Sequence, residues 1–140
     1  MDQIIIEWIR YTDFFDLYDA LGREPKLVYV IGETHHCYIG SVGSRHGTGG
    51  LAVRYEKQYL DRARAIFGMD KPQHQPAYAG QFVSPIRPDS ELVEAIERNI
   101  QSLFLKSVGQ AAALFKPRGM LKALHWSNQG EIPRFLLGGE

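Results

Sequence analysis

The stretches LVYVIG (Leu27–Gly32) and CYIGS (Cys37–Ser41) decide the fold of this chain. Both are rich in β-branched and aromatic residues, which favour strands. Four polar residues, 33–36 (Glu-Thr-His-His), separate them, and a connection of that length is typical of a β-hairpin. The sequence therefore predicts an antiparallel pair of strands in which Ile31 lies opposite Tyr38.

This register places the two tyrosines Tyr29 and Tyr38 on one face of the hairpin. Their diagonal separation is expected to be about 7–8 Å between backbone positions, which lets two phenol groups reach the same ligand. The alternative is that both are ordinary sheet aromatics with hydrated hydroxyls. The hairpin alone does not separate these two interpretations.

Outward from the hairpin, hydrophobic periodicity and turn residues predict further strands and helices. Together they indicate an α+β fold, with a small antiparallel β-sheet flanked by helices, in a single domain spanning residues 1–140. The expected strands are residues 4–8 and Ala77–Ser84, and the expected helices are a segment N-capped by Thr12 and ending at Gly22, Leu51–Phe67, a segment from Asp89 or Ser90 to about Val108, and a short Ala111–Phe115.

Composition excludes several classes of protein. The 140 residues are 44% hydrophobic, which excludes intrinsic disorder. The 16 basic and 16 acidic side chains cancel, so binding to nucleic acid through bulk positive charge is not expected. One cysteine cannot form an intramolecular disulfide, and no apolar stretch approaches the length of a membrane span. These features predict a cytoplasmic protein that does not enter a membrane.

The hairpin also belongs to a longer series of motifs. It is followed by Gly50-Leu51-Ala52-Val53-Arg54 and later by Glu97-Arg98-Asn99-Ile100. In this order and spacing the motifs resemble the GIY-YIG nuclease family. Tyr38-Ile39-Gly40-Ser41 matches the second signature, whereas Leu27-Val28 replaces the Gly-Ile of the first. The resemblance covers a core of about residues 26–108, which leaves an N-terminal and a C-terminal extension without an assigned role.

The resemblance implies an endonuclease that hydrolyses phosphodiester bonds in DNA with Mg²⁺ or Mn²⁺. Tyr29 or Tyr38 would help to deprotonate a water molecule, Arg54 would stabilise the charge on the phosphate, and Glu97 would be the metal ligand. These four catalytic candidates are then expected to converge in one cleft. Because small restriction nucleases of this family often work as dimers, the resemblance also implies a homodimer.

Candidate DNA contacts lie between the hairpin and the following helix. The glycine-rich stretch 43–50 would let backbone amides approach a phosphate, and it carries Arg45 and His46. Lys57 and Gln58 on the predicted helix complete the set of candidates. The alternative interpretation of the glycines is a flexible loop without a ligand.

Three glutamates compete for the role of metal ligand on the predicted helix that follows Asp89. At 100° per residue, Glu97 lies nearer the centre of the hydrophobic stripe than Glu94 or Glu91. A carboxylate at that boundary could be held by packing while its oxygens reach a cleft, which suits Mg²⁺. The alternative is that all three are surface charges.

Two positions depart from the family pattern. Gln58 stands where the family usually has His or Tyr, and Gly109 stands where it often has Asn, a place that Asn128 could fill. These departures favour an alternative function, a catalytically inactive GIY-YIG-like module that binds nucleic acid or a protein partner. A third interpretation is an unrelated α+β protein in which the motifs occur by chance.

Overall fold

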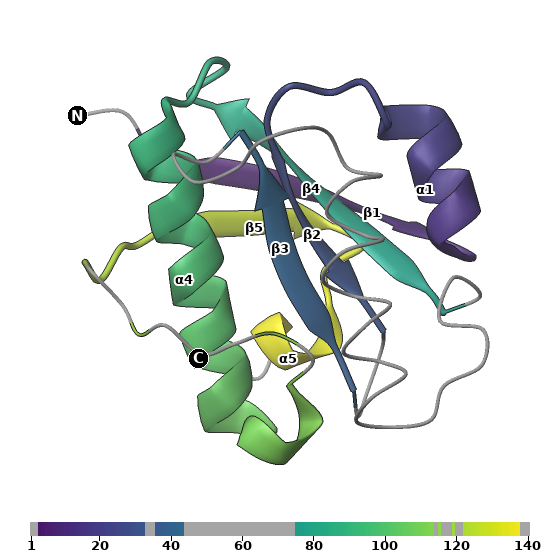
Figure 1. Ribbon diagram of the computed structural model, residues 1–140. Coiled ribbons are helices and arrows are strands. Elements are labelled where there is room, and N and C mark those ends of the chain that lie inside the picture. Colours follow the sequence, from purple (N-terminus) through teal and green to yellow (C-terminus); the bar gives the residue numbers. More distant parts are fainter. Residues whose placement is uncertain are drawn as a thin grey trace.

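The computed structural model describes residues 3–32, 36–43, 75–113, 115, 119 and 122–137. They form an α+β fold in which helices flank a five-stranded sheet, as the sequence predicts (Figure 1). In chain order the elements are β1 (Ile5–Tyr11), α1 (Phe14–Leu21), β2 (Leu27–Ile31), β3 (Tyr38–Val42), β4 (Ala77–Ser84), α4 (Ser90–Ser107), a 3-10 helix η3 (Gln110–Ala112), β5 (Ser127–Gly130) and α5 (Arg134–Leu137).

The strands lie in the order β3-β2-β4-β1-β5, so that β3 and β5 form the two edges of this sheet. The hairpin of β2 and β3 has the predicted register, with Ile31 opposite Tyr38 and Tyr29 opposite Gly40. β4 pairs antiparallel with both β2 and β1. The predicted strand at residues 4–8 is confirmed as β1, which extends further, to Tyr11.

The pairings among β3, β2, β4 and β1 are antiparallel, as predicted, and the addition of β5 makes the sheet mixed. β5 pairs parallel with β1, with Ser127 N–H donating to the carbonyl of Ile4 (2.9 Å) and Glu131 N–H donating to the carbonyl of Trp8 (2.8 Å). The sequence of β5 is Ser-Asn-Gln-Gly, which contains no residue with a preference for strands. The tertiary position of this segment beside β1 therefore decides its conformation.

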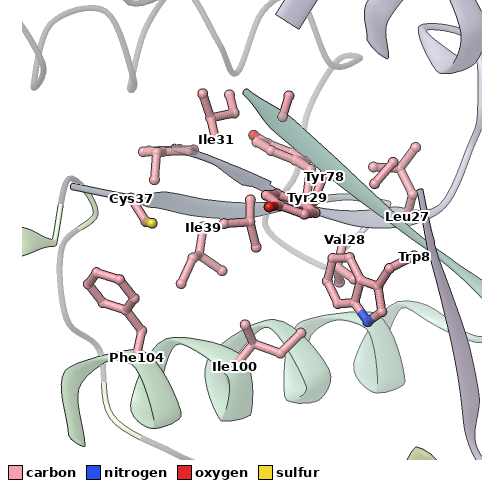
Figure 2. Packing of buried hydrophobic residues seen from close by; sticks show 14 of the residues in the cluster. Trp8, Leu27, Val28, Tyr29, Ile31, Cys37, Ile39, Tyr78, Ile100 and Phe104 are labelled. Carbon is pink, nitrogen blue, oxygen red and sulfur yellow. The ribbon is translucent and has the colours of Figure 1, made fainter. Parts of the chain in front are cut away.

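Helices cover both faces of the sheet. α4 packs against β3 and β2, and α1 packs against β4 and β1 from the opposite side (Figures 1 and 2). Figure 2 shows Ile100 and Phe104 pointing from α4 toward the sheet, where they meet Cys37 and Ile39. All five residues of β2 are buried. A strand buried on both faces is expected to be apolar throughout rather than alternating, which explains the LVYVI sequence.

Capping residues set the starts of the two longer helices. The N-cap of α1 is Asp13 and not Thr12 as predicted, because the Asp13 carboxylate accepts a hydrogen bond from the backbone N–H of Asp16 (3.0 Å). α4 begins after Asp89, whose carboxylate accepts from Leu92 N–H (2.8 Å). The C-cap of α4 is Val108, as predicted.

The helix that was predicted after α4 is replaced by a shorter element. In place of a helix at 111–115, the chain forms the 3-10 turn η3, and Ala113 then makes a parallel bridge with Cys37. The predicted glycine-rich loop after β3 and the predicted helix 51–67 lie outside the described residues. Among the residues that the structure describes, no helix is both long enough and apolar enough to cross a membrane.

Candidate functional site

The two tyrosines of the hairpin are neighbours. The ring centroids of Tyr29 and Tyr38 are 6.0 Å apart, and the ring planes make an angle of 24°, a stacked arrangement. Both side chains are buried. The shared face that the sequence predicts is thereby confirmed, while the catalytic role of the pair stays a prediction.

Gly40 makes room for this pair. It lies opposite Tyr29, and a Cβ atom at Gly40 would be 2.6 Å from the Tyr29 hydroxyl oxygen and 3.0 Å from a ring carbon of Tyr38. The side chain of Tyr29 therefore extends from β2 over the neighbouring strand β3. A glycine at this position is a steric requirement, because any side chain would occupy the space of the phenol group.

We expect Gly40→Ala to lower the free energy of unfolding by about 1–3 kcal/mol, the usual cost of overpacking a dense core. Denaturant unfolding measures this change. In a Tyr29→Leu background, where the phenol is gone, the same substitution should cost clearly less, since the two sites are in contact. An equal cost in both backgrounds would show that the tyrosine is not what excludes a side chain at position 40.

On α4, Glu97 takes part in a buried network of hydrogen bonds. Its Oε1 accepts a hydrogen bond from the hydroxyl of Ser41 on β3, and its Oε2 accepts one from Nε2 of Gln101 (3.2 Å). The same Gln101 nitrogen donates to the backbone carbonyl of Ile39 (2.9 Å). Glu97 is only 4% exposed, so it is a buried carboxylate and not a boundary carboxylate as the helical wheel predicts.

The helical wheel also fails to separate Glu97 from Glu94. Glu94 is 1% exposed, and its Oε2 lies 3.9 Å from a guanidinium nitrogen of Arg98. The buried arc of α4 is therefore wider than its apolar stripe. On another part of the helix, Asn99 holds a second segment by donating to the carbonyl of Lys122 (2.8 Å) and accepting from the N–H of Leu124 (3.1 Å). Only Glu91 is exposed, as expected for a surface charge.

The tyrosines and Glu97 belong to opposite faces of the sheet. Successive side chains of a strand point to opposite faces. Ser41 points toward α4 and contacts Glu97. The preceding residue, Gly40, faces the opposite side of the sheet, and the tyrosine rings lie over it there. The tyrosine rings and Glu97 therefore do not share a face of the sheet, and the predicted convergence in one cleft also involves Arg54, which lies outside the described residues. The phenol of Tyr29 and the carboxylate reach consecutive residues of the edge strand β3 from its two sides.

Several predicted site residues cannot be placed in this arrangement. Arg54 lies outside the described residues, and so do the four candidate DNA contacts, Arg45, His46, Lys57 and Gln58. The roles of these five residues stay predictions.

Asn128 lies on β5, at the edge of the described sheet opposite β3, whereas Glu97 contacts β3. The Oδ1 atom of Asn128 accepts hydrogen bonds from the indole N–H groups of Trp8 (2.8 Å) and Trp126 (2.9 Å). These contacts assign Asn128 a structural role and do not support its use in place of the family's Asn.

The donor set around Glu97 fits the cation that the resemblance implies. A carboxylate supplies the hard oxygen ligands that Mg²⁺ prefers, and Mg²⁺ commonly binds only one or two carboxylates while it keeps several waters. Both oxygens of Glu97 also accept hydrogen bonds within the protein, from Ser41 and from Gln101. Among the described residues, no group of three or more histidine, cysteine or acidic side chains is gathered for a metal.

Sequence reasoning missed Ser41 and Gln101 as members of this site. Gln101 stands four residues after Glu97, a spacing at which helical side chains are neighbours, so its contact could have been expected. Ser41 lies on a strand and contacts a helix that is distant in the sequence, so no local pattern predicts this contact.

Comparisons with protein-family models, with curated proteins and with solved structures found no match for this chain. The resemblance to GIY-YIG nucleases therefore rests on the motifs quoted above.

Proposed function

We propose that this protein is an endonuclease that hydrolyses phosphodiester bonds in DNA with the help of Mg²⁺ or Mn²⁺, in the manner of the GIY-YIG nucleases that it resembles. One observation carries the proposal. Glu97 accepts a hydrogen bond from Ser41, so two of the motifs that carry the resemblance, Tyr38-Ile39-Gly40-Ser41 and Glu97-Arg98-Asn99-Ile100, meet in the fold although they are far apart in the sequence. In a reaction of this kind a carboxylate binds the cation and a phenol handles a proton.

In this proposal each residue has a distinct role. Tyr29 or Tyr38 helps to remove a proton from the attacking water, and a free tyrosine titrates near pH 10, so positive charge nearby would be needed. Arg54 supplies such charge and clamps the phosphate. Glu97 would hold the metal ion, which when bound stabilises negative charge on the leaving oxygen. A cytoplasmic location and a homodimer remain expectations that accompany the proposal.

A second function is favoured by a different observation. The backbone of β3 separates Glu97 from the tyrosine rings, and both carboxylate oxygens accept hydrogen bonds within the protein. A carboxylate in this setting joins α4 to the sheet whether or not a metal is present. The second candidate is therefore an inactive GIY-YIG-like module that binds nucleic acid or a protein partner.

A plasmid-nicking assay tests the first function against the second. Purified protein is incubated with supercoiled plasmid in Mg²⁺, in Mn²⁺ and in EDTA, and the products are separated on an agarose gel. We expect nicked circles in either metal, none in EDTA, and recovery when excess metal is restored. Plasmid that is retarded on a native gel but never cut would support the binding module, and cutting in EDTA would reject the role of a metal.

A further inference from the structure

A chain of buried polar groups connects α4 to the edge strand β3. It runs from the hydroxyl of Ser41 to the carboxylate of Glu97, then to the amide of Gln101, and ends at the backbone carbonyl of Ile39. All three side chains are buried. The contacts join two segments that are about sixty residues apart in the sequence, so only the folded protein assembles them.

The amide of Gln101 has its orientation set by two acceptors. Its Nε2 lies 2.9 Å from the carbonyl oxygen of Ile39 and 3.2 Å from Oε2 of Glu97. The backbone carbonyl and an ionised carboxylate can accept hydrogen bonds but cannot donate them. The nitrogen of the Gln101 amide, and not its oxygen, must therefore face both groups. Gln101 is thus held by the backbone of the sheet while it donates to the carboxylate.

Two donors on different elements hold the two carboxylate oxygens. Ser41 fixes Oε1 relative to β3, and Gln101 fixes Oε2 relative to α4. An ionised carboxylate is costly to bury unless hydrogen bonds replace its water, and these bonds serve that purpose. They also restrict the rotation of the carboxylate, because both oxygens are held at once.

We propose that Ser41 and Gln101 are positioning residues that hold the Glu97 carboxylate in a fixed orientation for a divalent cation. This inference rests on the proposed function, in which Glu97 is the metal ligand. Groups that hydrogen-bond to a ligating side chain tune its basicity and direction, and their loss typically weakens metal binding by about 10-fold to 100-fold. Ser41 and Gln101 contact the carboxylate in this way on either side.

The test measures Mn²⁺ binding to the full chain, by the electron paramagnetic resonance signal of free Mn²⁺ and by calorimetry. The variants are Ser41→Ala, Gln101→Met and, as the reference for loss of the ligand, Glu97→Gln. Matched controls are Ser107→Ala and Gln110→Met, which make the same changes at exposed positions. Thermal unfolding in EDTA, followed by circular dichroism, checks that each variant is folded at the temperature of the binding measurement.

We expect the dissociation constant for Mn²⁺ to rise by about 10-fold or more in each of the two positioning variants and to stay unchanged in the controls. A purely structural role predicts a lower melting temperature with unchanged Mn²⁺ affinity in the folded protein, and that result would overturn the inference. If Gln101→Met does not fold, Ser41→Ala decides the question, because it removes a single oxygen atom.

The outcome also separates this inference from the proposed function. Mn²⁺ binding that is lost in Glu97→Gln but intact in both positioning variants rejects the inference and leaves the nuclease proposal standing. If Glu97→Gln binds Mn²⁺ as tightly as the wild type, Glu97 is not the metal ligand, and the positioning role of Ser41 and Gln101 is rejected as well.

Discussion

Glu97→Gln is expected to lower the rate of metal-dependent plasmid nicking by at least about 100-fold, the range found when a group that stabilises transition-state charge is removed. Glutamine has nearly the shape of glutamate but carries no charge, so the buried space around Ser41 and Gln101 stays filled. What is lost is the anionic oxygen that would bind the cation. The initial rate of conversion of supercoiled to nicked plasmid at saturating Mg²⁺ measures the effect.

Glu91→Gln is the matched control for this change. It makes the same substitution on the same helix, α4, but at an exposed position near the N-terminus, and it should nick at the wild-type rate. Thermal unfolding of both variants in the assay buffer excludes loss of fold as the cause. Nicking by Glu97→Gln at the wild-type rate would remove this carboxylate from the catalytic proposal.

Phe104→Ala is expected to destabilise the domain by about 3–5 kcal/mol, as large-to-small substitutions of core phenylalanines do. The Phe104 ring is fully buried on α4 and makes edge-to-face contacts with Phe115 (5.9 Å between centroids) and Phe135 (5.2 Å). Such pairs add to the energy of burial. Because Phe135 lies in α5, the substitution should also loosen the attachment of the C-terminal helix.

Equilibrium unfolding in guanidinium chloride measures this loss, with Phe15→Ala as the control. Phe15 is 53% exposed on α1, so its truncation should cost about 1 kcal/mol or less. Hydrogen exchange of the α5 amides reports the local effect, and we expect their protection to fall more than that of β2. Similar losses for the two variants would mean that the aromatic cluster around Phe104 does not anchor the core.

Much of the fold was accessible from local patterns in the sequence. The hairpin and its register follow from two β-rich stretches joined by four polar residues, and the structure has Ile31 opposite Tyr38 as expected. In a hairpin the length of the connection fixes which residues pair, and here four polar residues form that connection. α4 was also expected to run from Asp89 or Ser90 to about Val108, and the structure places its end at Ser107 with Val108 as the C-cap.

Other features depended on contacts between distant segments. The parallel pairing of β5 with β1 joins residues more than one hundred positions apart and uses a polar sequence with no strand preference. The contact of α4 with the segment at Lys122 and Leu124 depends on Asn99, which lies more than twenty residues away in the sequence. The hydrophobic periodicity of the helix does not predict that this second segment packs against it.

The sequence by itself determined the α+β class, the hairpin and the shared face of Tyr29 and Tyr38, because each depends on residues close together in the chain. Only the tertiary structure decided that Glu97 faces Ser41 on the other side of the edge strand, and that Gln101 links both to the sheet. The physical reason is that strand alternation is a local property, whereas the choice of face that a helix covers depends on packing of the whole core.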